Sequence, residues 1–168
     1  MKRLYLLRHA KSSWDDSSLP DHDRPLAGRG RRASKAIARH LREEDIKPDL
    51  VLCSSARRAR ETLDRLEKAL GASTVQVEDD LYAASASQLL DRVRRVPDGV
   101  ESVMLIGHNP GLQELALGLA RASATADELA AKYPTAALAT LEFSASSWRE
   151  LDNGAADLVA LVRPRDLE

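Results

Sequence analysis

The sequence predicts an α/β fold, a three-layer sandwich with helices on both faces of a largely parallel central sheet of about six strands. Three short runs are apolar on both faces, as strands buried between two helical layers must be. These runs are residues 4–7, 50–53 and 103–106. Helical patterns alternate with the runs along the chain, and this alternation is typical of parallel sheets. Weaker strand patterns lie at residues 75–77, 137–143 and 158–162.

Helix-terminal signals lie between these strands. Gly71 ends one apolar helical pattern, Ser85 begins another with a capping box, and Asn109 followed by Pro110 fits an N-cap and a first helical residue. The alanine-rich stretch 120–131 is either a further helix or a mobile flap. The four helices expected from periodicity are residues 30–44, 59–70, 85–96 and 109–119.

Composition indicates an ordinary globular protein. The 168 residues fit a single domain spanning 1–168, with 43% hydrophobic and 30% charged residues. A net charge of -1 gives no general attraction to nucleic acid or to an anionic membrane, so neither is expected as a partner. One cysteine, Cys53, excludes an internal disulfide and fits a reducing compartment. The N-terminal apolar run is too short for a signal peptide, so we expect a cytoplasmic protein.

Charged side chains follow the three apolar runs at the strand ends, where open α/β sheets place their sites. Arg8 and His9 follow the first run, Arg57 and Arg58 the second, and His108 the third. Arginines match phosphate oxygens, and they also disfavour protonation of a histidine that must be neutral to attack phosphorus. Each motif alone also fits a packed histidine, a helix cap or a solvated basic face. Their coincidence at three strand ends favours phosphoryl chemistry, for which we expect no metal and no cofactor.

These motifs resemble those of a known family. Residues 8–10 (Arg-His-Ala) resemble the Arg-His-Gly signature of the histidine phosphatase superfamily, and residues 54–62 and 107–108 are similar to its second and third signatures. Residues 24–30 resemble the entry to its first helix. The short chain and the opening over residues 8–14 look most like the SixA-type phosphohistidine phosphatases. The resemblance implies a phosphoglycerate mutase-like fold.

The resemblance also implies a role for each matching position. It makes His9 the nucleophile that accepts the phosphoryl group. Arg8 and Arg58 become the phosphate clamp, and the Arg-Ala step selects Arg58 over its neighbour. His108 becomes the partner that contacts the phosphoryl oxygens, and Ser12 a further phosphate contact.

Two positions depart from the family pattern. Ala10 replaces the signature glycine, which should be tolerated if the backbone there does not need positive φ. Ala83 stands where larger members carry a glutamate acid. A missing acid favours a substrate with a good leaving group, such as phosphohistidine, over a sugar phosphate. Asp21, Asp23 or Asp80 remain possible substitutes for the glutamate acid.

The leading hypothesis is therefore hydrolysis of phosphohistidine in a partner protein. A phosphomonoesterase for a small phosphate ester would use the same residues with a different pocket. A metal-dependent hydrolase would draw ligands from residues 21–23 with His9 and His108, but no spacing matches a tight metal motif. A non-catalytic module that holds phosphorylated partners is the fourth alternative.

Overall fold

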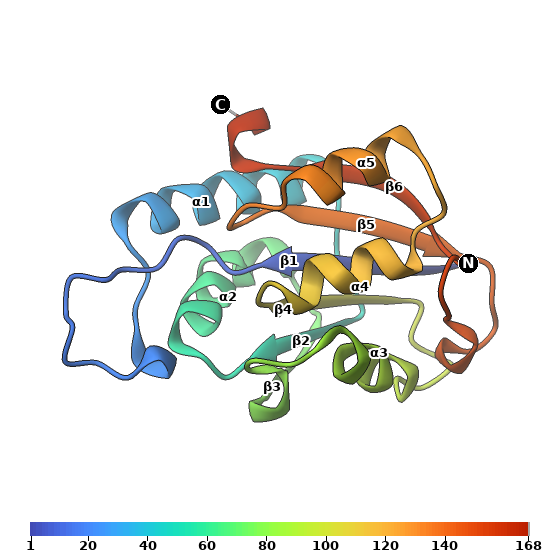
Figure 1. The fold of residues 1–168 in the computed structure, drawn as a ribbon, viewed down its shortest axis with the longest axis horizontal. Coiled ribbons are helices and arrows are strands. Elements are labelled where there is room, and N and C mark those ends of the chain that lie inside the picture. Colours follow the sequence, from blue (N-terminus) through green and yellow to red (C-terminus); the bar gives the residue numbers. More distant parts are fainter. Residues whose placement is uncertain (168) are drawn as a thin grey trace.

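Six strands form one mixed sheet in the computed structural model, which describes residues 1–167 (Figure 1). The strand order is β3-β2-β4-β1-β5-β6. The first four strands in this order are mutually parallel, and β5 runs antiparallel to both of its neighbours. The predicted largely parallel sheet of six strands is thus confirmed. The bounds are β1 (Lys2–Arg8), β2 (Leu50–Ser54), β3 (Thr74–Glu78), β4 (Ser102–Gly107), β5 (Leu138–Phe143) and β6 (Asp157–Val162).

Helices cover both faces of this sheet because β1 is apolar on both sides. Leu4 and Leu6 belong to one buried cluster, and Tyr5 and Leu7 belong to the other. The first cluster lies under α3 (Ala86–Arg94), α4 (Gly111–Leu119) and α5 (Ala124–Ala131), and the second lies under α1 (Gly28–Glu43) and α2 (Arg57–Leu70). None of the helices in the described chain is long and apolar enough to cross a membrane.

Most of the predicted helix signals hold. Gly71 follows the last residue of α2 with φ 66°, a conformation that glycine adopts at little cost. The capping box is present, since the Ser85 side chain accepts from the Gln88 backbone and the Gln88 side chain accepts from the Ser85 backbone. The predicted start of α4 is wrong by one residue. Its first helical residue is Gly111, and the N-cap position falls on Pro110. The Asn109 side chain, one position earlier, still accepts from the backbone N–H of Gln113 in the first turn, at 3.2 Å.

The stretch 120–131 forms a packed helix over Ala124–Ala131, not a flap. Leu129 on α5 is fully buried, and its carbonyl accepts a 2.8 Å hydrogen bond from Gln113 Nε2 on α4. In the view of Figure 1, α5 lies beside α4 and β6. The chain that follows α5 returns to the site, since the Tyr133 carbonyl accepts from Arg8 Nη1 at 3.1 Å.

The loop after β1 is held against the start of α1 by close backbone contact. Ala27 N donates to Lys11 O at 2.9 Å, and Ser12 pairs with Leu26 in an isolated β-bridge. A Cβ on Gly30 would lie 2.1 Å from Lys11 O, so only glycine fits there without movement. This contact fixes the residues directly after His9.

We expect Gly30→Ala to lower the free energy of unfolding by about 1–3 kcal/mol, because the added methyl meets backbone and not a flexible side chain. Gly28→Ala is the matched control in the same helix. Its Cβ would meet only side-chain atoms, the nearest at 3.5 Å. Urea unfolding of both variants checks this, and equal stability of Gly30→Ala and Gly28→Ala would contradict the packing described.

Candidate active site

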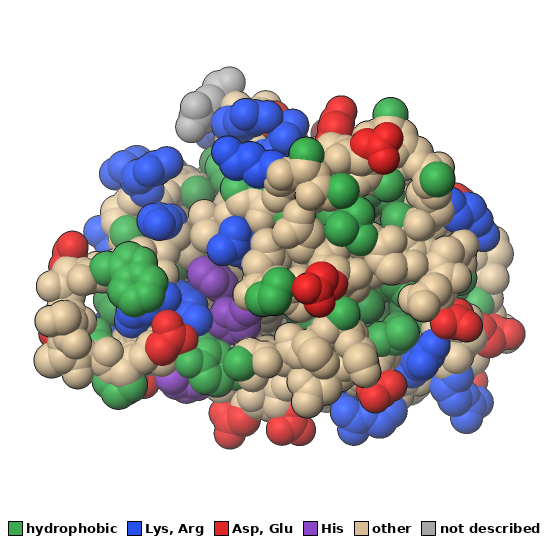
Figure 2. All heavy atoms as spheres, viewed as in Figure 1, with side chains coloured by type: hydrophobic (Ala, Val, Ile, Leu, Met, Phe, Trp, Pro, Cys, Tyr) green, Lys and Arg blue, Asp and Glu red, His purple; other side chains and the backbone are tan. Residues whose placement is uncertain are grey.

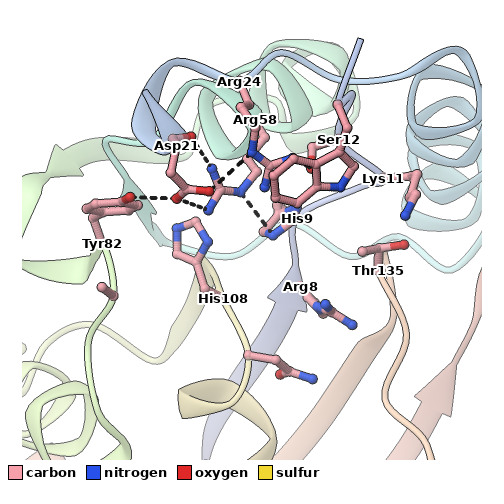
Figure 3. A pocket seen from close by; sticks show the side chains of 13 residues that line it. Arg8, His9, Lys11, Ser12, Asp21, Arg24, Arg58, Tyr82, His108 and Thr135 are labelled. Atoms are coloured by element: carbon pink, nitrogen blue, oxygen red, sulfur yellow. Dashed lines mark hydrogen bonds and ion pairs between the residues drawn. The ribbon is translucent and has the colours of Figure 1, made fainter. Parts of the chain in front are cut away.

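The carboxyl ends of β1, β2 and β4 surround a pocket of about 450 Å³ (Figure 3). It contains the five residues to which the family resemblance gives a role, although His9 and His108 are 99 positions apart in the chain. These residues are Arg8, His9, Ser12, Arg58 and His108. The two imidazole rings lie 5.0 Å apart between centroids. The lining residues are Arg8, His9, Lys11, Ser12, Trp14, Asp21, Arg24, Arg58, Tyr82, Ala83, His108, Asn109 and Thr135.

His9 is held as a neutral imidazole with one ring nitrogen free of a proton. Its Nδ1 lies 2.7 Å from the carbonyl oxygen of Ala10, which can only accept, so Nδ1 carries the proton. The other nitrogen, Nε2, accepts a 3.4 Å hydrogen bond from Arg58 Nε. Burial, with smaller contributions from His108, Arg58 and Arg8, lowers the pKa of His9 to about 3. The Nε2 lone pair is therefore available at neutral pH.

Arg58 enters the pocket from the first turn of α2. Thr62 Oγ1 donates to Arg58 O at 2.7 Å and accepts from Ala10 N at 3.1 Å, which ties this turn to the end of β1. Ala10 has no positive φ, consistent with the predicted tolerance of alanine there. Arg57 is exposed instead and pairs with Glu61 at 2.9 Å. The structure thus places Arg58, and not Arg57, beside His9.

Asp21 holds the Arg58 guanidinium in place. Its carbonyl accepts from Arg58 Nη1 at 2.7 Å, and its Oδ2 accepts from Arg58 Nη2 at 3.0 Å. The same carboxylate accepts from the Tyr82 hydroxyl at 2.6 Å and from Arg24 Nε at 3.1 Å. The hydrogen bond from Tyr82, reinforced by Arg58 and Arg24, lowers the pKa of Asp21 well below its usual range. Asp21 is therefore ionised, which makes it an anchor and not a proton donor.

The other candidate acids lie outside the pocket. Neither Asp23 nor Asp80 lines it, whereas Ala83 does, with φ 57°. Within residues 1–167, Asp21 is the one carboxyl group among the lining residues.

Two buried nitrogen atoms of the site lack hydrogen-bond partners in the described chain. They are Arg8 Nε and His108 Nδ1. The other His108 nitrogen, Nε2, lies 2.7 Å from Ser54 Oγ. Burial, then Arg58 and Arg8, lower the pKa of His108 to about 4, with Asp21 opposing them. A buried unpaired polar group is costly. Arg8 Nε can only donate, so it indicates a site shaped for a ligand with an acceptor oxygen, and His108 Nδ1 is a second group free to bind that ligand.

Ser12 lies in the pocket, where its Oγ accepts from Arg24 Nη1 at 2.7 Å. Sequence reasoning missed Arg24 and Tyr82 as site residues. The sequence pattern places Arg24 only in the segment 24–30 that resembles the start of the family's first helix. Tyr82 lies beyond the edge strand β3, in a segment without a pattern that indicates a site residue. The Asp-x-x-Arg spacing from Asp21 to Arg24 is the signal that was available, since their side chains pair across one 3₁₀ turn.

Of the residues proposed as alternative metal ligands, His9, Asp21 and His108 line the pocket, whereas His22 and Asp23 do not. Among residues 1–167, no group of three or more His, Cys, Asp or Glu side chains is placed to hold a metal ion. His22 faces Ser55, with 2.9 Å between Nε2 and Oγ.

Residues 4–94 match the family model of the histidine phosphatase superfamily (branch 1). The chain belongs to this superfamily. An uncharacterised protein of Mycobacterium tuberculosis is 37% identical over 163 residues, which cover 95% of this chain and all of the relative. Membership of this family, whose signature residues converge in the pocket, supports phosphatase activity.

Solved structures of this superfamily share the whole fold. A Nakamurella multipartitia protein assigned to the SixA phosphohistidine phosphatases is 30% identical, with a TM-score of 0.84 and coverage of 97% of this chain and 96% of that one. An Agrobacterium tumefaciens protein with the same assignment is 29% identical, with a TM-score of 0.83 and coverage of 97% and 98%. The predicted phosphoglycerate mutase-like fold of a histidine phosphatase is confirmed.

We expect Asp21→Asn to lower kcat/KM for para-nitrophenyl phosphate by about 10–100-fold, because an amide cannot accept from all of the present donors and lets Arg58 move. Asp23→Asn is the control, since Asp23 is exposed and lies outside the pocket lining. Steady-state kinetics on both variants checks this. Equal activity of Asp21→Asn and the wild type would show that Arg58 does not need this anchor.

The two histidines should make the protein lose stability in mild acid. Their folded pKa values of about 3 and 4 lie below the ordinary 6.5, so between pH 6.5 and 4 the unfolded chain binds more protons. The free energy of unfolding then falls as pH falls, by up to about 1.4 kcal/mol per pH unit for each histidine.

Urea unfolding from pH 7 to 4.5 measures this slope. His9→Asn removes one of the two histidines, so the slope of its free energy of unfolding against pH should be shallower than that of the wild type by up to about 1.4 kcal/mol per pH unit. His40→Asn, on α1, is the control that should keep the wild-type slope. Parallel curves for His9→Asn and the wild type would contradict a neutral, buried His9.

Proposed function

We propose that this protein hydrolyses phosphohistidine in another protein, through a covalent phosphohistidine on His9. The observation that carries the proposal is geometric: His9 Nδ1 pairs with the carbonyl of Ala10, which leaves Nε2 facing Arg58, and the Asp21 carboxylate beside them is occupied by Tyr82 and Arg58. The lowered pKa values of His9 and Asp21 agree with a neutral imidazole and an ionised carboxylate. The superfamily membership and the likeness to proteins assigned as SixA phosphohistidine phosphatases support it.

In the first step, the Nε2 lone pair of His9 attacks the phosphorus of the substrate. The bond between phosphorus and the substrate imidazole nitrogen breaks as the new P–N bond forms. Arg8, Arg58 and His108 stabilise the negative charge on the transferring oxygens. In the His108 tautomer that carries its proton on Nδ1, the Ser54 hydroxyl donates to Nε2 and the unpartnered Nδ1 donates to a phosphoryl oxygen.

The leaving group explains why no protonated carboxyl is needed. A phosphorylated imidazole that bears a proton on its second nitrogen leaves as neutral imidazole, so no proton has to be delivered. An alkoxide from a sugar phosphate would need one. Asp21 cannot supply it, because its carboxylate is ionised and occupied by Tyr82, Arg24 and Arg58. The pocket thus favours phosphohistidine over an alkyl phosphate.

In the second step, water attacks the phosphorus, and the bond between phosphorus and His9 Nε2 breaks. Phosphate leaves with one proton of the water, and the other passes to a phosphate oxygen or to solvent. The hydrogen bond from His9 Nδ1 to Ala10 O keeps its proton throughout, so the imidazole returns in its starting tautomer.

The test uses a synthetic peptide with one histidine, phosphorylated with radiolabelled phosphoramidate. Early quenching should trap acid-labile, base-stable label on the protein. The label should be absent in His9→Ala, whose kcat/KM should fall by about 10³-fold or more. His40→Asn is the control that should retain both label and turnover.

Three results would contradict the proposal. Full turnover by His9→Ala would remove His9 as nucleophile. Faster hydrolysis of small phosphate esters than of the peptide would support the phosphomonoesterase alternative. Stoichiometric binding of the peptide without phosphate release would support a non-catalytic binding module.

A further inference from the structure

Five basic side chains stand beside the pocket without an acidic partner. All five are exposed, and none forms an ion pair with any residue that the structure describes. By contrast, Arg39 later in α1 pairs with Glu43, and Arg57 in α2 pairs with Glu61. We call these five side chains the basic rim: Lys11, Arg29, Arg31, Arg32 and Lys35.

The basic rim is continuous with the pocket. Lys11 lines the pocket, and its backbone touches α1 at Gly30. A Cβ on Gly28 would have Arg32 Nη1 at 3.5 Å and Arg31 Nη2 at 3.6 Å, so two guanidinium groups flank the first residue of the helix. Figure 2 shows Lys and Arg side chains gathered over the α1 end of the molecule, next to the histidines at the pocket mouth.

The charge of this surface opposes the stability of the helix that carries it. The first turn of α1 has no acidic residue, and Arg29, Arg31 and Arg32 lie within its first five positions. Basic groups at the N-terminal end of a helix repel the positive end of its dipole, and they also repel each other. Arg31 Nη1 donates a 3.2 Å hydrogen bond to Leu26 O, but this bond to a neutral carbonyl offsets neither repulsion. An anionic ligand at the surface would relieve both.

Trp14 adds an apolar contact at the same pocket mouth. Its side chain lines the pocket yet is 70% exposed. The guanidinium of buried Arg24 stacks on it, 3.5 Å from the ring centroid, and Arg24 is itself fixed by Asp21 and Ser12. An exposed, rigidly held tryptophan beside a pocket is typical of a protein–protein contact.

We propose that the basic rim and Trp14 dock an acidic protein segment that carries the phosphohistidine. This proposal rests on the function proposed above and names the chemistry of its partner. Asp and Glu residues flanking the phosphohistidine pair with the basic rim, and an apolar side chain of the segment packs on Trp14. Charge complementarity steers the partner to the pocket, which raises kcat/KM through the association rate.

The experiment compares two synthetic peptides, each with one phosphohistidine made with phosphoramidate. One has Asp and Glu around the histidine, and the other has Asn and Gln at the same positions. At low salt the wild type should prefer the acidic peptide by about tenfold in kcat/KM. The preference should shrink toward unity near 1 M salt, where the Debye length is about 3 Å.

The variant Arg29→Gln/Arg32→Gln/Lys35→Gln should lose most of this preference. Its control, Arg39→Gln/Arg42→Gln/Lys47→Gln, removes the same charge from the far end of α1 and beyond, and it should keep the preference. The readout is the ratio of kcat/KM between the two peptides. A variant that contains less active protein loses rate equally on both peptides, so this ratio does not change. Trp14→Ala should lower kcat/KM for both peptides relative to free phosphohistidine, and Trp14→Phe should restore part of it.

Each outcome separates the two proposals. Equal rates on both peptides in the wild type, or an unchanged preference in the basic-rim variant, would overturn the docking proposal and leave the phosphohistidine activity standing. No turnover of either peptide would overturn the proposed function itself, and the docking proposal with it.

Discussion

The hydrogen bond from His9 Nδ1 to the carbonyl of Ala10 decides what this site can do. It assigns the proton to Nδ1 and leaves Nε2 unprotonated, with a lone pair that accepts the 3.4 Å hydrogen bond from Arg58. Burial in a pocket rich in arginine then keeps the ring from gaining a second proton. Without this bond the imidazole could turn or change tautomer, and a protonated Nε2 would have no lone pair for the proposed attack on phosphorus.

The rest of the site supports this arrangement at a cost to stability. Arg8 Nε and His108 Nδ1 are buried without partners among residues 1–167. The pKa values of His9 and His108 are also lowered, so both stay neutral at a pH where an ordinary histidine is protonated. Asp21 limits the cost by neutralising part of the arginine charge and by fixing Arg58. The same anchoring removes Asp21 as an acid. A pocket lined by Arg8 and Arg58, and with no protonated carboxyl group among its described lining residues, is suited to a phosphoryl group on a good leaving group.

The sheet and its strand-end residues could be predicted because they follow from local pattern. Apolar runs identify the parallel strands, and parallel strands bring their carboxyl ends to one edge, so Arg8, His9 and His108 had to lie near one another. Arg58 needed the family resemblance, because Arg57 carries the same charge one position earlier. The two arginines are neighbours on α2 and point in different directions around the helix, so Arg58 is buried and Arg57 is exposed.

The supporting network could not be predicted, because it depends on how a loop folds back. Asp21 and Arg24 lie between two regular elements, and Tyr82 lies beyond the edge strand, so no periodicity relates them. Only the folded chain shows that Tyr82 donates to Asp21 and thereby fixes its ionised state. The role of the basic rim depends in the same way on the contact between Gly30 and Lys11.

The most direct test is the protonation state of His9, measured by ring nitrogen NMR on protein labelled with ¹⁵N-histidine, with His9→Asn to assign the signals. The account predicts a neutral ring at pH 6 with the proton on Nδ1 and a bare Nε2. A protonated ring at that pH, or a proton on Nε2 with a bare Nδ1, would contradict it.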